Sequence, residues 1–355
     1  MAASKLKPLS AWMAERNTAY YQSASTSIYE DFETYAQSPH GLLTCANANA
    51  FHQWALLHPQ ESYGVLEAGV GEGAFALGFL QELAEADREN GTQISSMLRY
   101  TLADFSKPML QKAKARLASE GFASQIEILE WDAAHPNKLN ENSESVFPNI
   151  SFDLIRCNEL FCDLPADVFV RSGEDLSTVH YDNHLQPHTV PVPWEALERP
   201  EQEMMRALPE DYHLPVSRTA RNALLFLSHH LADEGRVDIF DYGFYRAEDF
   251  VMPAEIWNLS LVREYNSQWT VDVNFLYLSA SLTNAGFKTR VEPQAEYAEL
   301  YRAVCSPPKV LKKNKKEEKA GKKSKPAHEG LDYDEGESED GIEEDDFFYH
   351  LEVQP

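Results

Sequence analysis

The segment from Tyr63 to Gly73 limits the possible folds of this chain more than any other stretch of its sequence. It reads Y-G-V-L-E-A-G-V-G-E-G, an apolar run that ends in three glycines at alternate positions. A short apolar run is typical of a buried strand, and glycine tolerates the positive φ angles that a sharp reversal of the backbone requires. The next segment, Ala74–Ala84, keeps apolar residues at helical spacing. The pattern therefore predicts a parallel strand, a tight glycine loop and a helix.

A glycine loop in this position is where α/β proteins bind nucleotide-type cofactors. Dinucleotide-binding domains use the spacing G-x-G-x-x-G and place an acidic residue about 20 residues further on. Here the glycines are Gly69, Gly71 and Gly73, and the next predicted strand ends at Asp104, well beyond that distance. This arrangement favours S-adenosylmethionine (SAM) over NAD, with the glycines beside the amino-acid part of SAM and Glu67 among the binding residues. A strand-to-helix turn without a ligand is the alternative.

Polar and aromatic side chains also follow three further predicted strands, over residues 99–103, 126–130 and 152–157. The residues at these strand ends are Asp104, Phe105, Trp131, Asp132, Asn158 and Glu159. Because the carboxyl ends of parallel strands meet at one edge of a sheet, we expect them to surround one cofactor. Asp104 would hold the ribose, and Trp131 and Asp132 would contact the adenine ring and its amino group. Taken alone, Asp104 or Asp132 is more often a solvated helix cap.

The acidic composition narrows the choice of partners. The chain has 57 acidic and 31 basic residues among 355, a formal net charge of −26. Nucleic-acid binding needs clustered Lys and Arg, so this charge argues against a nucleic-acid substrate and favours a cationic one. No apolar run approaches the roughly 20 residues of a membrane span, and the N-terminus resembles neither a signal nor a transit peptide. We therefore expect a cytoplasmic protein without membrane contact.

The cysteines and histidines do not predict a metal site. The four cysteines lack the C-x-x-C spacing and the His partners of zinc sites, and reduced thiols are the simplest interpretation. The histidines at positions 180, 184 and 188 share one segment, but their spacing fits no recognised metal site. We expect no metal cofactor.

The remaining pattern divides the chain into three parts. Residues 1–60 predict a helical N-terminal cap that packs on the domain or covers the cofactor. Residues 61–308 predict a methyltransferase domain in which strands and helices alternate, which favours a mainly parallel sheet with helices on both faces. Within it, residues 172–215 lack regular periodicity and predict an irregular lid over the substrate.

The third part is the tail, residues 309–355. It is lysine-rich at 309–325 and acidic at 329–346, so it lacks the apolar surface that folding requires and should be disordered. The apolar residues 347–351 would form a loose terminus, with docking on a partner or on the domain as the alternative.

The segment Asn158–Pro165, N-E-L-F-C-D-L-P, resembles the N-E-x-x-D-A-L-P motif of the MidA family of SAM-dependent methyltransferases. The glycine motif, D-Y-G at 241–243 and later blocks at 263–265, 270–275 and 294 match the family in the same order. The resemblance covers residues 60–300 without the lid and implies a Rossmann-like class I fold with a seven-stranded sheet. Two positions differ, because the family's Asp residues fall on Cys162 and Asn274.

The resemblance also implies a substrate, because the family's mitochondrial members methylate protein arginine during assembly of respiratory complex I. A guanidinium nucleophile must lose a proton, and a carboxylate that binds it can take up that proton. Glu159 is the first candidate for this role, and Asp241 or Asp163 is the second. Alternatively, these residues anchor their own loops through hydrogen bonds to the backbone. The rival functions are a small-molecule N- or O-methyltransferase and a non-catalytic assembly factor whose lid and tail contact partners.

Overall fold

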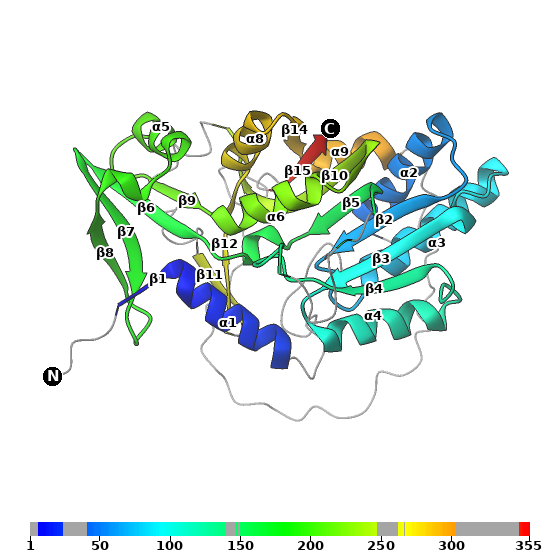
Figure 1. Ribbon diagram of the computed structural model, residues 1–355, viewed down its shortest axis with the longest axis horizontal. Helices are drawn as coiled ribbons and strands as arrows, with labels where there is room; N and C mark the ends of the chain where they lie inside the picture. Colours follow the sequence, from blue (N-terminus) through cyan, green and yellow to red (C-terminus); the bar gives the residue numbers. More distant parts are fainter. Residues whose placement is uncertain are drawn as a thin grey trace, which may run out of the picture.

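The computed structural model describes residues 6–23, 41–138, 147, 150–246, 262–265, 267–302 and 348–355. These residues form a large mixed sheet covered by helices and a smaller antiparallel sheet at one end of the molecule (Figure 1). The small sheet lies beyond the carboxyl ends of the parallel strands of the large sheet (Figure 1).

The large sheet has the strand order β14-β15-β10-β5-β2-β3-β4, and β13 adds an eighth strand by pairing with the end of β10. The strands are β2 Tyr63–Ala68, β3 Leu98–Asp104, β4 Ile126–Glu130, β5 Phe152–Asn158, β10 Leu231–Phe244, β13 Val273–Asn274, β14 Lys288–Pro293 and β15 Phe348–Gln354. The five strands from β10 to β4 are parallel, whereas β15 is antiparallel to both of its neighbours. The prediction of a Rossmann-like class I methyltransferase fold is confirmed.

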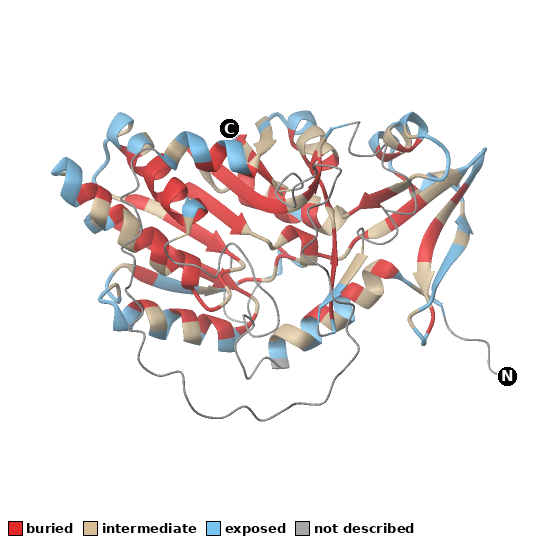
Figure 2. Cartoon of the chain, turned by 180° about the vertical axis from the view of Figure 1, so that it is seen from behind, coloured by how far each residue is buried: buried red, intermediate tan, exposed pale blue. Residues whose placement is uncertain are grey.

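Helices cover both faces of this sheet because its strands alternate between two apolar cores. Val65 of β2 packs in a core with residues of α2, α3 and α4, whereas its neighbour Leu66 packs in the core that contains α6 and α8. The helix α9 joins α2 on the first face. The helices are α2 Leu42–Leu57, α3 Ala74–Asn90, α4 Lys107–Ser119, α6 Arg218–Ser228, α8 Phe275–Asn284 and α9 Gln294–Arg302. In Figure 2 the central strands of the sheet are mostly buried, whereas the edge strands β4 and β14 are partly exposed.

The small sheet corrects the prediction of an irregular segment at 172–215. Its strands are β1 Lys7–Pro8, β6 Asp167–Ser172, β7 Asp175–Tyr181, β8 Pro187–Val192 and β9 His213–Val216, and α5 Arg199–Ala207 joins the last two. All pairings are antiparallel, in the order β1-β7-β6-β9 with β8 on the side of β7. The prolines of β8 obscured its strand pattern, although an edge strand tolerates them. A role as a lid stays a prediction.

The N-terminal helices predicted within residues 1–60 take different places. Helix α1, Leu9–Ser23, packs against the antiparallel hairpin of β11 Val262–Tyr265 and β12 Gln268–Val271. The rings of Trp12 and Trp269 stack there with centroids 6.4 Å apart. Helix α2 instead packs on α3 and α9 at the face of the large sheet.

The C-terminal strand β15 corrects the prediction of a disordered tail for its last residues. It lies between β10 and β14, and its alternate side chains Tyr349, Leu351 and Val353 are 3%, 0% and 0% exposed. Two neighbouring strands supply the apolar contacts and hydrogen bonds that this segment lacks by itself. The charged part of the tail lies outside the described residues.

Two further expectations concern cysteines and membranes. Cys157 and Cys162 are buried free thiols, as predicted, but Cys45 is disulfide-bonded. None of the helices in the described ranges is both long enough and apolar enough to cross a membrane.

A buried charged cluster holds β15 in place. The His350 ring lies between two carboxylates, with Nε2 3.1 Å from Asp238 Oδ1 and Nδ1 3.0 Å from Glu292 Oε1. Arg236 donates to the other oxygen of Asp238 at 2.9 Å. Burial alone would lower the pKa of His350, but the hydrogen bonds to Asp238 and Glu292 outweigh it and raise this pKa.

We expect the stabilisation by His350 to decrease as the pH rises. Its pKa is higher in the folded chain than the value of about 6.5 in an unfolded one, so its contribution is complete below that value and is lost as the pH rises through the folded pKa. Urea unfolding of the wild type and of His350→Gln should show a difference in stability that decreases as the pH is raised from about 6.5.

His135→Gln is the control, because His135 pairs with Asp132 on the surface and contributes little. A His350→Gln difference that is constant over this pH range would contradict the prediction.

Candidate active site

The glycine loop after β2 has the conformation that its sequence predicts. Gly69, Gly71 and Gly73 have φ angles of 73°, 53° and 74°, which only glycine adopts without strain. The amide of Gly69 donates to Ala103 O at 2.9 Å, and the amide of Gly71 donates to Asp104 Oδ2 at 3.1 Å. These bonds hold the loop against the carboxyl end of β3.

The loop is also packed tightly on both sides. A Cβ atom on Gly73 would lie 2.9 Å from the Cβ of Ala113 and 3.0 Å from its Cα, where α3 crosses α4. A Cβ on Gly69 would lie 3.1 Å from the side chain of Leu160 in the loop after β5. The absence of side chains therefore lets the loop, α4 and the β5 loop approach one another.

Glu67, predicted to bind the cofactor, lies beneath the loop in a buried ion pair. Its Oε2 accepts hydrogen bonds from Nε and Nη2 of Arg156, at 3.1 and 2.5 Å, and from the hydroxyl of Tyr100 at 2.5 Å. Arg156 is fully buried, with its guanidinium 4.3 and 4.2 Å from the ring centroids of Phe75 and Phe79.

Sequence reasoning missed Arg156. The signal was a single cation in the centre of the apolar strand 152–157, which needs a carboxylate partner if that strand is buried. Glu67 and Arg156 are partners in the β2–β5 register, so the pair fixes how these two strands align.

Asp104 connects the loop after β3 to the glycine loop. It is 8% exposed, and its two oxygens accept from the amides of Ser106, at 2.8 Å, and Gly71. Burial raises its pKa to about 6, against the opposing effect of these hydrogen bonds. Phe105 follows it and meets the ring of Tyr21 edge-on, with centroids 6.0 Å apart.

Trp131 and Asp132 follow β4. The amide of Trp131 donates to Asp104 O at 3.0 Å, but its side chain is 3% exposed and packs in the core against Phe226. Asp132 accepts from the amide of Ala134 at 2.9 Å and stabilises a turn, whereas the helix cap expected of an Asp taken alone is absent because no helix begins in the described residues 131–138.

Asn158 and Glu159 form the turn after β5. The side-chain amide nitrogen and oxygen of Asn158 are both buried, and neither has a hydrogen-bond partner. Glu159 has a φ of 46°, a left-handed conformation that is uncommon for a residue other than glycine. Its own amide donates to Phe240 O at 2.8 Å. A buried amide without partners and a strained backbone are both features of ligand-binding sites.

Asp241 and Asp163 hold the next part of this turn. Oδ2 of Asp241, which is 0% exposed, accepts from the amides of Phe161, at 2.8 Å, and Cys162, at 3.1 Å. Asp163 accepts hydrogen bonds from the hydroxyl of Tyr21, at 2.5 Å, and from the side-chain amide of Gln268. Burial raises the pKa of each carboxyl to about 7.

Contacts between neighbouring strand ends thus form one chain across the edge of the sheet. The end of β10 is hydrogen-bonded to the turn after β5, and that turn packs against the glycine loop. The glycine loop is hydrogen-bonded to Asp104, which is in turn hydrogen-bonded to the residue after β4. All the strand ends predicted to surround a cofactor therefore meet, although the side chain of Trp131 and the Oε2 atom of Glu67 have partners inside the protein.

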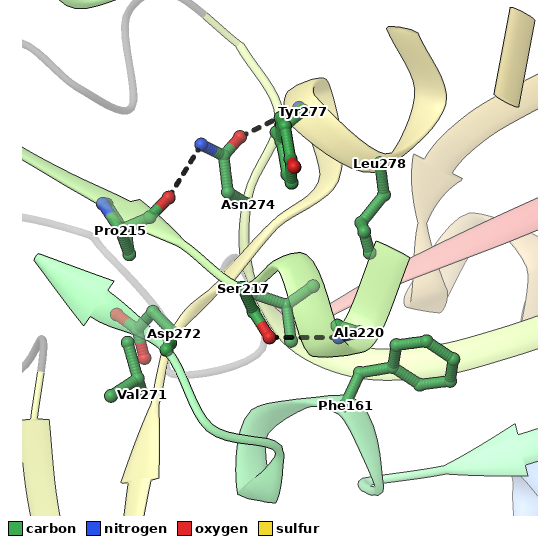
Figure 3. Close-up of a pocket in the computed structure, with 11 residues that line it drawn as sticks. Phe161, Pro215, Ser217, Ala220, Val271, Asp272, Asn274, Tyr277 and Leu278 are labelled. Carbon is green, nitrogen blue, oxygen red and sulfur yellow. Dashed lines mark hydrogen bonds between the residues drawn. The ribbon is translucent and has the colours of Figure 1, made fainter. Parts of the chain in front are cut away.

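Arg263 and Asn274 lie in later blocks of the resemblance, although Asn274 replaces the family's Asp, and both belong to the framework. Asn274 donates to Pro215 O at 3.0 Å and accepts from the amide of Tyr277 at 2.9 Å, which caps α8 (Figure 3). Arg263 pairs with Asp272 at 2.6 Å. The cavity beside Asn274 has room for about one water molecule. It is therefore too small for a cofactor.

The edge of the sheet fits the chemistry of SAM. A glycine loop lets a ligand approach its backbone closely, and the unpartnered side-chain amide of Asn158 suits the carboxylate and ammonium groups of the amino-acid part of SAM. Asp104 offers a carboxylate to the ribose hydroxyls. Among the described residues, no group of three or more His, Cys, Asp or Glu side chains is placed to bind a metal ion.

We expect Gly73→Ala to destabilise the protein by about 2–4 kcal/mol, because it adds a clash with Ala113 to the strain of a left-handed alanine. Gly121→Ala is the matched control, since Gly121 also has a positive φ, of +95°, but a Cβ there meets nothing within 4 Å. Urea unfolding should show that this control lowers the free energy of unfolding by about 1 kcal/mol. Equal losses in the two variants would show that the packing of α3 on α4 is not tight.

Comparisons with known proteins agree with this geometry. In solved structures, the chain is similar to an uncharacterised superfamily member from Burkholderia thailandensis, with 19% identity and a TM-score of 0.58 over 83% of this chain and 76% of that chain. It is also similar to a superfamily member described as a "likely methyl transferase" from the same organism, bound to S-adenosyl-homocysteine. That match has 16% identity and a TM-score of 0.62 and covers 99% of this chain and 88% of that one.

The comparison with curated proteins gives no match. Residues 47–279 match the model of a family described as "putative S-adenosyl-L-methionine-dependent methyltransferase". The chain belongs to this family of SAM-dependent methyltransferases.

Proposed function

We propose that this methyltransferase transfers the methyl group of SAM to an arginine side chain of a protein. The resemblance to the MidA family implies this substrate, and the placement of Glu159 supports it. Glu159 lies at the carboxyl end of β5, on the turn whose other side contacts the glycine loop. A carboxylate there would face both a bound cofactor and an incoming side chain.

The reaction needs alignment and a proton acceptor. When bound, SAM supplies a methyl group whose bond to sulfur breaks as the bond to the substrate nitrogen forms. Glu159 would accept hydrogen bonds from the guanidinium, localise its charge and take up the proton that the methylated nitrogen loses. Asn158 and the glycine loop would hold the amino-acid part of the cofactor, and Asp104 its ribose.

The two other carboxylates suit this role less well. The oxygens of Asp163 and Asp241 accept hydrogen bonds from donors within the protein, so neither group is poised to receive a guanidinium. They stay the second candidates. The net charge of −26 favours a cationic acceptor over nucleic acid. The cytoplasmic location and the contact of the tail with a partner are also still predictions.

Asn158→Leu tests the cofactor site. We expect the ligand-free variant to be at least as stable as the wild type, because leucine removes a buried amide that has no partner. We expect affinity for S-adenosylhomocysteine (SAH) to fall about tenfold, measured by isothermal titration. Asn222→Leu, on the exposed side of α6, is the control and should bind SAH normally. Unchanged SAH affinity in Asn158→Leu would remove Asn158 from the site.

Glu159→Gln tests the chemistry. Extract from a strain that lacks the gene is incubated with methyl-labelled SAM and purified protein, and mass spectrometry identifies the labelled residues. The wild type should label arginine, whereas Glu159→Gln should bind SAH normally and label at least about 100-fold more slowly, because the proton acceptor is lost. Glu174→Gln, in an exposed turn of the small sheet, is the matched control.

The labelled product decides between the rival functions. Label in small molecules would favour the small-molecule N- or O-methyltransferase. No label, together with full complementation of the deletion by Glu159→Gln, would favour the non-catalytic assembly factor.

A further inference from the structure

Three parts of the chain that are far apart in sequence meet at Asp163. Tyr21 of α1 donates its hydroxyl hydrogen to Asp163 Oδ2 at 2.5 Å, and Gln268 of β12 donates to Oδ1. The side chain of Asn17, one turn before Tyr21, donates to Asp163 O at 2.8 Å and to Trp269 O at 2.7 Å. The amide of Trp269 donates back to Asn17 at 2.8 Å. Helix α1 and the hairpin β11–β12 are therefore locked to the turn after β5.

The end of α1 also contacts the loop after β3. Ser106, which is 1% exposed, donates its hydroxyl hydrogen to Tyr21 O at 2.9 Å, and the amide of Ser106 donates to Asp104. Tyr21 therefore contacts two loops of the cofactor site, the one that carries Asp104 and the one that carries Glu159.

The turn after β5 requires such support because it is strained. The left-handed backbone conformation of Glu159 costs free energy. Such a conformation persists only where several surrounding contacts enforce it. Asp241 fixes the middle of the turn by binding the amides of Phe161 and Cys162. Asp163 is the anchor at its far end, where its side chain accepts from Tyr21 and Gln268, which lie outside the large sheet, and from the neighbouring thiol of Cys162.

We propose that Tyr21 and Asp163 are positioning residues for methyl transfer, which hold the turn of Asn158 and Glu159 in its reactive geometry. Asp163 then acts through its hydrogen bonds and takes up no proton from the substrate. In this proposal the N-terminal helix α1 contributes to the active site by supplying Tyr21. The effect on rate rests on the proposed function of Glu159, whereas the effect on the turn does not.

Tyr21→Phe is the decisive variant, because it removes one hydroxyl and keeps the ring that contacts Phe105. Three quantities are measured on the full chain: the rate of label transfer from saturating SAM into the deletion-strain extract, the Kd for SAH, and hydrogen exchange of the amides at 159–163. We expect the rate to fall about tenfold, the Kd to change less than about threefold, and exchange of the turn to become faster.

Tyr181→Phe is the matched control, since its ring also packs on the hairpin, 4.8 Å from Trp269, and its hydroxyl has no hydrogen bond among the described residues. It should change none of the three quantities. Gln268→Leu removes the second donor that lies outside the turn and should reproduce the effect of Tyr21→Phe. The double variant Tyr21→Phe with Glu159→Gln should be no slower than Glu159→Gln alone, because both changes act on one group.

Unchanged exchange of the turn in both Tyr21→Phe and Gln268→Leu would overturn the proposal, as would a loss of SAH affinity equal to the loss of rate. If the wild type labels no acceptor, the proposed function fails. Hydrogen exchange and SAH affinity still decide whether the contacts of Tyr21 and Gln268 with Asp163 hold the turn.

Discussion

The buried ion pair of Glu67 and Arg156 is the interaction on which the rest of the site depends. It joins β2 to β5 at matching positions, and Arg156 lies on the rings of Phe75 and Phe79 in the first turns of α3. The pair therefore sets the alignment of the two central strands and the start of the helix that follows the glycine loop. Removal of either partner would leave a charge without a counter-ion in the core, which is strongly unfavourable.

The carboxylates near the edge of the sheet differ in the hydrogen bonds they accept or in the backbone that carries them. Those of Glu67, Asp163 and Asp241 accept hydrogen bonds from several donors within the protein, so their charge supports the framework. Asp104 is intermediate, since it holds the glycine loop and also lies where the ribose is expected. Glu159 differs from these because the backbone around it is strained, and strain is retained only where surrounding contacts enforce it. This distinction supports Glu159 as the residue that acts on the substrate.

Segments remote in sequence complete both ends of the molecule. The last residues of the chain fill the gap between β10 and β14, where His350 brings a positive charge between two carboxylates. Near the other end of the chain, α1 and β1 join the small sheet and the hairpin to the edge of the large sheet where the active site is proposed. The body of the methyltransferase fold thus depends on its C-terminus, and the proposed site on its N-terminal helix.

The local pattern of the sequence determined the central half of the fold and which strand ends meet at the proposed site. The alternation of apolar strands with helices, and the glycines that require positive φ, are short-range properties, so β2 to β5, the glycine loop and the meeting of their ends could be predicted. Which carboxylates are anchors could not, because a hydrogen-bond partner such as Tyr21 for Asp163 lies 142 positions away. The small sheet and β15 were missed for the same reason, since prolines or a charged tail hide short strands whose stability comes from neighbours. Tertiary structure alone decided these points, because pairing across the sheet supplies burial and hydrogen bonds that no local sequence contains.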